Sequence, residues 1–214
     1  MRIAIGTHLS EAVLPQVYFN HIGVIAKWAK QYDLVMTGTH RTKVAAARNR
    51  IIDAALAERC DHVLFIDSDH LLPDNMLDCL TENAAAAMVS GLVCKRLFPY
   101  DTVAFKLLPD GQLQQIVVNA RGKVIEVDGC AMGCTLINLD LIKQLERPYF
   151  RDRFFRSDLG LCLAFRRKGM KVLLDTRVEI GHLSDPLIIT PGNAERVRCN
   201  MLSVHLEKAN GCSD

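Results

Sequence analysis

The chain has 214 residues, of which 50% are hydrophobic and 23% are charged, a composition that is typical of one globular domain and excludes a disordered chain. Its formal net charge of +2 is too small to indicate a globally basic nucleic-acid binder. No apolar stretch approaches transmembrane length, and the N-terminus has the pattern of a short strand rather than a signal peptide, so we expect a cytoplasmic protein with reduced cysteines.

The first half of the chain alternates predicted strands and helices. Strands are expected at 3–6, at 33–36, in a segment that ends at residue 67 and at 88–94, and helices over 15–31, 42–59 and 73–85. Thr42 is expected to cap the second of these helices, and Pro73 to begin the first turn of the third. This order favours an α/β fold with a mostly parallel sheet flanked by helices.

The pattern changes after residue 94. The runs 103–108 and 113–118, on either side of an Asp-Gly turn, predict a hairpin, and 124–128 a further strand, so a small antiparallel insert is expected here. We then expect an apolar segment at 134–137, helices over 139–145 and 157–169, and strands at 171–174 and 178–180. Residues 193–208 are expected to form an amphipathic helix that packs on the domain, or on another subunit in a homo-oligomer.

Residues 62–70 are the most informative stretch. A short apolar run, typical of a strand buried on both faces, ends in Asp67-Ser68-Asp69. Open α/β sheets bind ligands at the carboxyl ends of their strands, and residues two apart in an extended chain point to the same side. Two converging carboxylates repel each other unless a cation such as Mg²⁺ or Mn²⁺ lies between them. The same residues are also ordinary turn and helix-cap residues, and both interpretations stay open at this point.

Three other side chains extend the metal hypothesis. Arg48 lies on the apolar face of its predicted helix, between Val44 and Ile52, where phosphate oxygens, the two carboxylates or a salt bridge at the core edge would satisfy its charge. Asp158 faces inward at a helix N-terminus, where it either caps the helix or belongs to the site. His182 follows a strand end, where a histidine is either an ordinary residue or a ligand for a metal such as Mn²⁺.

In this order the residues resemble glycosyltransferases of the GT-A fold, above all the small family 2-like members. The resemblance covers roughly residues 1–185 and rests on Ala47-Arg48-Asn49-Arg50, Phe65-Ile66-Asp67-Ser68-Asp69 as the Asp-x-Asp motif, the small residues 129–135, Asp158, and the segment 175–182. It implies a catalytic domain at 1–185, with a nucleotide-binding half at 1–95 and an acceptor half at 96–185, followed by a helical extension at 186–214.

The resemblance also implies that the donor is a nucleoside diphosphate sugar. It assigns donor contacts to Thr7, Arg48, Asp67, Ser68 and Asp69. Mn²⁺ or Mg²⁺ would be held by Asp67, Asp69 and His182, with Asp67 toward the nucleotide and Asp69 on the metal that bridges the diphosphate. Such a cation would neutralise the charge that develops on the leaving diphosphate.

The resemblance places Asp158 beside the acceptor hydroxyl. It would be the general base if the enzyme inverts configuration, and an orienting group if the enzyme retains configuration. Such helices often begin with two acidic residues, whereas the first residue here is Ser157. The acceptor stays open among saccharide, lipid-linked sugar, protein, metabolite and modified nucleic-acid base, because no motif marks the insert or the C-terminal segment.

Three alternative functions remain. A nucleotidyltransferase would use the same metal and diphosphate chemistry, but its glycine-rich, arginine-containing loop does not follow the first strand, 3–6. A phosphatase of the haloacid dehalogenase type usually places Asp-x-Asp on its first strand, with Thr or Val two residues after the second Asp, where this chain has Leu71. The third alternative is a non-catalytic nucleotide-binding protein with the same fold.

Overall fold

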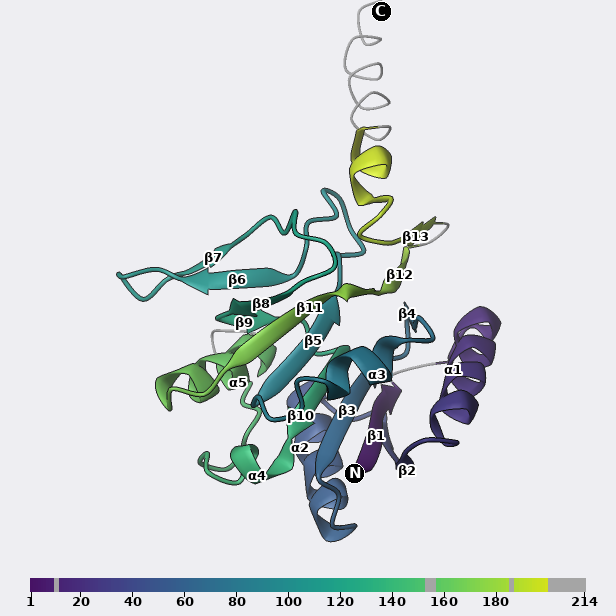
Figure 1. The fold of residues 1–214 in the computed structure, drawn as a ribbon, viewed down its shortest axis with the longest axis vertical. Coiled ribbons are helices and arrows are strands. Elements are labelled where there is room, and N and C mark those ends of the chain that lie inside the picture. The colour runs from purple at the N-terminus through teal and green to yellow at the C-terminus, as the bar shows by residue number, and fades with distance from the viewer. Residues whose placement is uncertain (10–11, 153–156, 185–186, 200–214) are drawn as a thin grey trace, which may run out of the picture.

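The computed structural model describes residues 1–9, 12–152, 157–184 and 187–199. Its central sheet has seven strands, in the spatial order β2 (Asp33–His40), β1 (Arg2–Leu9), β3 (His62–Asp67), β10 (Cys134–Asn138), β5 (Met88–Leu92), β11 (Val172–Glu179) and β8 (Val124–Val127) (Figure 1). β10 and β8 run antiparallel to their neighbours, and the other strands share one direction. The predicted mostly parallel sheet is therefore confirmed.

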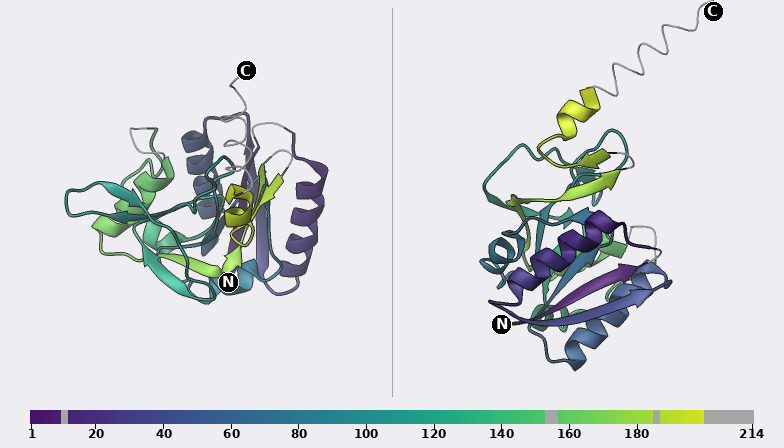
Figure 2. Two further views of the ribbon diagram at one scale, coloured as in Figure 1. Left: turned by 90° about the horizontal axis from the view of Figure 1, so that it is seen from above. Right: turned by 90° about the vertical axis from the view of Figure 1, so that its right-hand side faces the viewer.

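Helices cover both faces of this sheet. They are α1 (Pro15–Trp28), α2 (Val44–Ala57), α3 (Met76–Thr81), α4 (Leu139–Ile142) and α5 (Ser157–Arg167). α1 and α2 lie on opposite sides of β1 and β2 (Figure 2). Phe65 of β3 belongs to the same buried cluster as Ile51 of α2, whereas Leu64 belongs to the cluster that contains Trp28 of α1. Alternate residues of β3 thus face two separate cores, which is why the strand reads as a continuous apolar run.

Two small sheets flank the large one. The predicted hairpin forms as β6 (Ala104–Leu107) and β7 (Leu113–Gln115), and β6 also pairs with β9 (Gly129–Cys130). The second small sheet joins β4 (His70–Leu71), β12 (Gly181–Ser184) and β13 (Leu187–Ile189). In this second sheet His70 lies directly opposite His182. Two segments far apart in the sequence therefore meet beside the end of β3.

Three local predictions are wrong. Thr42 does not cap α2: Lys43 is the N-cap residue and makes no side-chain capping bond, because the Thr42 hydroxyl donates to the carbonyl of His40 at 3.1 Å. Pro73 precedes α3, which begins only after a turn in which Met76 N donates to Pro73 O at 3.1 Å. The last two predicted strands form one strand, β11, which pairs with β5 up to Asp175 and resumes that pairing after a register shift.

The end of the chain is described only in part. Residues 194–199 are helical and residue 193 lies in a turn, whereas residues 200–208 of the predicted helix lie outside the described residues. Of the helices that the structure describes, none combines the length and the apolar character that a membrane span requires. Of the cysteines that the structure describes, six are buried as free thiols, namely Cys60, Cys79, Cys94, Cys130, Cys134 and Cys162, whereas Cys199 is exposed.

Gly6 of β1 tests how tightly the sheet packs on α2. A Cβ at Gly6 would lie 2.5 Å from Cγ2 of Ile51. The Ile51 side chain is fully buried, so it has no free space into which it could shift. We expect Gly6→Ala to lower the free energy of unfolding by about 1–3 kcal/mol, as overpacking does, measured by urea denaturation.

Gly23 provides the matched control, because a Cβ there, within α1, would meet no atom within 4 Å. Gly23→Ala should raise the free energy of unfolding by about 0.5–1 kcal/mol, since alanine favours the helix. Equal destabilisation by both substitutions would contradict the proposed packing.

Candidate functional site

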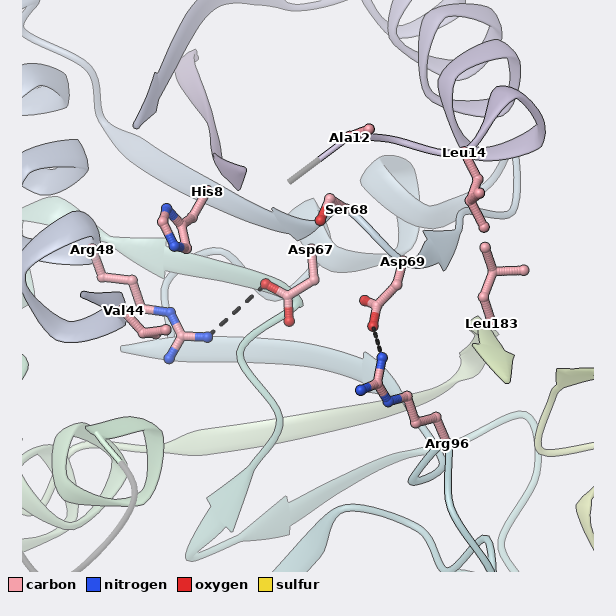
Figure 3. Close-up of a pocket in the computed structure, with 10 residues that line it drawn as sticks. All are labelled: His8, Ala12, Leu14, Val44, Arg48, Asp67, Ser68, Asp69, Arg96 and Leu183. Atoms are coloured by element: carbon pink, nitrogen blue, oxygen red, sulfur yellow. Dashed lines mark ion pairs between the residues drawn. The ribbon is translucent and has the colours of Figure 1, made fainter. Parts of the chain in front are cut away.

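A cavity of about 400 Å³ opens at the carboxyl end of β3 (Figure 3). Asp67 is the last residue of β3, and Ser68 and Asp69 form the turn that leads into β4. Both carboxylates point into the same space (Figure 3). The residues that line it are His8, Ala12, Leu14, Val44, Arg48, Asp67, Ser68, Asp69, Arg96 and Leu183.

Asp69 meets two histidines beside this cavity. His182 Nε2 lies 3.2 Å from Asp69 Oδ2, and His70 Nε2 lies 3.9 Å from Asp69 Oδ1. One ligand atom from each of the three residues lies within 4.8 Å of the others. The imidazole rings of His70 and His182 pack edge to face, with centroids 4.5 Å apart. Two imidazole nitrogens and a carboxylate oxygen therefore surround a small common volume.

The other ring nitrogen of each histidine is bound to a backbone carbonyl. His70 Nδ1 lies 3.0 Å from Gly133 O, and His182 Nδ1 lies 2.7 Å from Cys94 O. Because a carbonyl oxygen can only accept, both Nδ1 atoms carry protons and donate them. This is the arrangement usually found in metal-binding histidines, because it orients Nε2 toward the ion. The donor set of Asp69, His70 and His182 therefore fits a divalent metal.

Charge and burial act differently on these groups. Burial alone would raise the pKa of Asp69, but the hydrogen bond from His182 and the positive groups around it hold that pKa below its ordinary value. Burial alone would lower the pKa of His182, but the hydrogen bonds to Asp69 and to the Cys94 carbonyl raise it above its ordinary value. The pKa of the fully buried His70 is lowered, chiefly by desolvation. This shift favours the neutral form of His70, whose Nε2 lies 3.9 Å from Asp69 Oδ1.

Arg48 joins the two other acidic residues of the site. Its guanidinium forms an ion pair with Asp158, donates to Ser157 Oγ at 3.3 Å and lies 4.0 Å from Asp67 Oδ1. The side chain is 8% exposed, so its burial lowers the pKa of Arg48, while the charge of Asp67 opposes that change. An arginine stays charged even under such conditions. The partners that the sequence left open are thus the carboxylates of Asp158 and Asp67.

Gly133 allows the site to be this compact. Its carbonyl accepts from the backbone N–H of Asp67 at 3.0 Å and from His70 Nδ1. A Cβ at this position would lie 2.5 Å from His70 Cε1 and still closer to Asp67 Oδ2. Only glycine therefore lets the β9–β10 connection approach both residues at once.

Comparison with known proteins supports the fold. No family model and no curated protein matches the sequence. The chain is similar to the solved structure of A197 from STIV, with a TM-score of 0.63 and 19% identity, over 90% of this chain and 91% of that one. It is also similar to GalNAc-T7 solved with UDP, GalNAc and Mn²⁺, with a TM-score of 0.55 and 11% identity, over 84% of this chain but only 43% of that one. The fold is GT-A-like.

The structure brings most of the predicted site residues together. Arg48, Asp67, Ser68 and Asp69 line the cavity, Asp158 contacts Arg48, and His182 contacts Asp69. Thr7 is not among the cavity-lining residues that the structure describes. Successive side chains of a strand point to opposite faces, so Thr7 faces away from the side of β1 that carries His8.

Sequence reasoning missed three residues of the site. His8 lies beside Asp67 in the β1–β3 register and lines the cavity, Arg96 lies 3.7 Å from Asp69, and His70 faces Asp69. For His70 the sequence did contain a signal, because this histidine directly follows the Asp-x-Asp motif. For the other two, only the register of the strands and the path of the loop after β5 reveal their position.

The Asp69–His182 pair can be tested by titration. We expect Asp69→Asn to lower the pKa of His182 in the metal-free protein, followed by NMR of the ring protons, because the carboxylate stabilises the imidazolium. A raised histidine pKa stabilises the fold below the unfolded value of about 6.5, and this contribution is lost as pH rises through the folded pKa. The stability difference between wild type and Asp69→Asn should therefore shrink above that pKa. The control Asp74→Asn, at a residue that pairs with Lys27 instead, should leave the His182 titration unchanged.

Gly133 gives a second test. Gly133→Ala should weaken Mn²⁺ binding by about tenfold or more, measured by isothermal titration calorimetry. The added Cβ would displace the side chains of Asp67 and His70, and a metal site tolerates displacements of only a few tenths of an ångström. Gly160→Ala is the matched control, since a Cβ at Gly160 would meet no atom of the described residues within 4 Å. Unchanged Mn²⁺ affinity in Gly133→Ala would contradict the assignment of His70 to a metal site.

Proposed function

We propose that the protein is a metal-dependent glycosyltransferase, which moves a sugar from a nucleoside diphosphate sugar to an acceptor hydroxyl. The observation that carries this proposal is the cluster of Asp69, His70 and His182, with both Nδ1 atoms fixed by carbonyls, beside Asp67 at the carboxyl end of β3. The similar fold of GalNAc-T7, solved with UDP, GalNAc and Mn²⁺, supports it. We propose that residues 1–95 hold the donor and 96–185 form the acceptor side of one catalytic domain.

In this proposal Asp69, His70 and His182 would hold the metal. His70 is an addition to the set that the sequence suggested, whereas Asp67 is not part of this cluster and lies 4.0 Å from Arg48. Imidazole ligands suit borderline ions, whereas Mg²⁺ prefers oxygen ligands, so Mn²⁺ is favoured over Mg²⁺. The bound cation would neutralise charge on the leaving diphosphate.

The protein side chains would bind and orient the donor. Arg48 and Ser68 line the cavity on either side of Asp67 and would meet phosphate or ribose oxygens. Thr7, which the sequence suggested as a contact to the base or ribose, does not line the cavity, so we do not propose it as a donor contact. The transfer breaks the bond between the sugar C1 and the diphosphate oxygen, whose electron pair leaves with the diphosphate, and forms a bond from the acceptor oxygen to C1. The proton of the acceptor hydroxyl would pass to the departing diphosphate if Asp158 only orients the acceptor, or to Asp158 if it acts as the base.

Asp158 is proposed to act on the acceptor. Both of its polar partners among the described residues, Arg48 Nη1 and Ser157 Oγ, contact the single oxygen Oδ1. Its second carboxylate oxygen is then the one to accept the hydroxyl of the acceptor. The contacts of Oδ1 with Arg48 and Ser157 hold this carboxylate in one position, which favours the orienting role over that of general base.

Nucleotide binding provides the first test. We expect one of UDP, GDP, CMP and TDP to raise the melting temperature in the presence of Mn²⁺, by about 5–10 °C at a hundredfold excess over Kd, because a ligand stabilises the folded state that it binds. The shift should be larger with Mn²⁺ than with Mg²⁺, and Asp69→Asn should remove its metal-dependent part. Asp140→Asn, at an exposed residue outside the cavity, is the control.

Product analysis then separates the candidate reactions. Incubation with a panel of nucleotide sugars should yield free sugar or a transferred sugar together with the nucleoside diphosphate. Release of inorganic phosphate from simple phosphate esters without sugar transfer would contradict the proposal and favour a phosphatase. Binding without any turnover would favour a non-catalytic nucleotide-binding protein.

A further inference from the structure

Arg96 is a second cation at Asp69. It lies in the loop that follows β5 and lines the cavity, with its Nη1 3.7 Å from Asp69 Oδ2 (Figure 3). The same carboxylate oxygen receives the contact from His182 Nε2 at 3.2 Å. Arg96 thus approaches the carboxylate that the proposed metal would bind, and it does so from the solvent side, with 59% of its side chain exposed.

The backbone beneath Arg96 is firmly held. Cys94 forms a β-bridge with Thr102, and Lys95 N donates to Asp101 O at 2.9 Å, so both ends of the loop are tied together. Tyr100, at the far end of the loop, is buried in a cluster with Cys94.

The C-terminal segment holds the same loop from outside. Arg198 Nε donates to the carbonyl of Pro99 at 2.5 Å, and its Nη2 lies 3.4 Å from Asp101 Oδ1. Ile189 and Ala194 pack into the cluster around Tyr100. With the loop fixed on both sides, the exposed side chain of Arg96 is the part that can change partner.

We propose that Arg96 pairs with Asp69 in the metal-free protein and moves to the diphosphate of the donor once a metal occupies that carboxylate. This inference rests on the proposed function, and it adds a residue that binds the leaving group. A metal and a guanidinium cannot both take Asp69 Oδ2 at short range, because two cations at one oxygen repel each other. The diphosphate supplies new negative charge at that moment, and the planar fork of arginine matches phosphate oxygens.

The consequence is a pair of effects with opposite sign. Without nucleotide, Arg96 competes with the metal for Asp69, so its removal strengthens metal binding. With nucleotide and metal, Arg96 binds the diphosphate, so its removal weakens nucleotide binding. During transfer the diphosphate gains the electron pair of the broken bond to C1, and Arg96 would stabilise that charge. A residue with a purely structural role would weaken both affinities together.

Arg96→Ala and Arg96→Lys test this, with Arg147→Ala as the matched control. Arg147 is an arginine of nearly equal exposure, 58%, in an ion pair with Asp53 outside the cavity. Calorimetry would measure Kd for Mn²⁺ alone, and then Kd for UDP, GDP, CDP and TDP, and for UMP, at saturating Mn²⁺.

We expect Arg96→Ala to tighten Mn²⁺ binding by about twofold to fivefold, as the loss of a competing exposed ion pair would. The same variant should weaken by about tenfold or more every diphosphate that the wild type binds. UMP, which lacks the second phosphate, should change much less, and Arg96→Lys should recover part of the diphosphate affinity. Arg147→Ala should match wild type in all measurements.

Two results would overturn the inference without touching the proposed function. The first is that Arg96→Ala weakens Mn²⁺ binding and diphosphate binding together. The second is that Arg96→Ala leaves both affinities unchanged while the wild type binds a nucleoside diphosphate. By contrast, failure of the wild type to bind any of the nucleotides with Mn²⁺ would contradict the proposed function, and the Mn²⁺ measurement would then still report on the competition at Asp69.

Discussion

Two backbone carbonyls determine the chemistry of this site. Gly133 O and Cys94 O each accept the Nδ1 proton of one histidine, so the Nε2 atoms of His70 and His182 are directed at Asp69. A histidine without such a partner turns freely about its side-chain bonds and presents either nitrogen. The carbonyls therefore orient two imidazoles toward one carboxylate, and the backbone that carries them has to be in place before the cluster can form.

That backbone depends on how the sheet is assembled. β10 enters antiparallel between β3 and β5, so the chain just before it, at Gly133, passes the end of β3 and accepts from the N–H of Asp67. The end of β5 leads into Cys94 on the other side. The pairing of β4 with β12 then sets His70 opposite His182. Each of these strand contacts brings one of these polar groups into the same small volume.

Charged residues gather at the site although the chain as a whole is nearly neutral. Asp67 and Asp69 line the cavity together with Arg48 and Arg96, and Asp158 pairs with Arg48. Arg48 is buried and joined to two carboxylates, which suits a fixed element of the site. Arg96 is exposed and joined weakly to one, which suits a group that exchanges partners. The two arginines thus differ in burial and in the number of carboxylates that they contact, and these differences suit different roles.

The sequence by itself determined the α/β class, the buried strand ending at Asp67, the hairpin after residue 94 and the inward face of α2 that carries Arg48. These features follow from local periodicity and turn chemistry, which need no knowledge of distant residues. Strand and helix ends were less accurate, as at Thr42 and Pro73, because hydrogen bonds available in the folded chain decide them. Only the tertiary structure decided that β10 lies between β3 and β5, that His70 faces His182, and that Arg96 reaches Asp69. The physical reason is that strand register and loop paths are set by packing between segments far apart in the chain, which leaves no periodic trace in the amino-acid sequence.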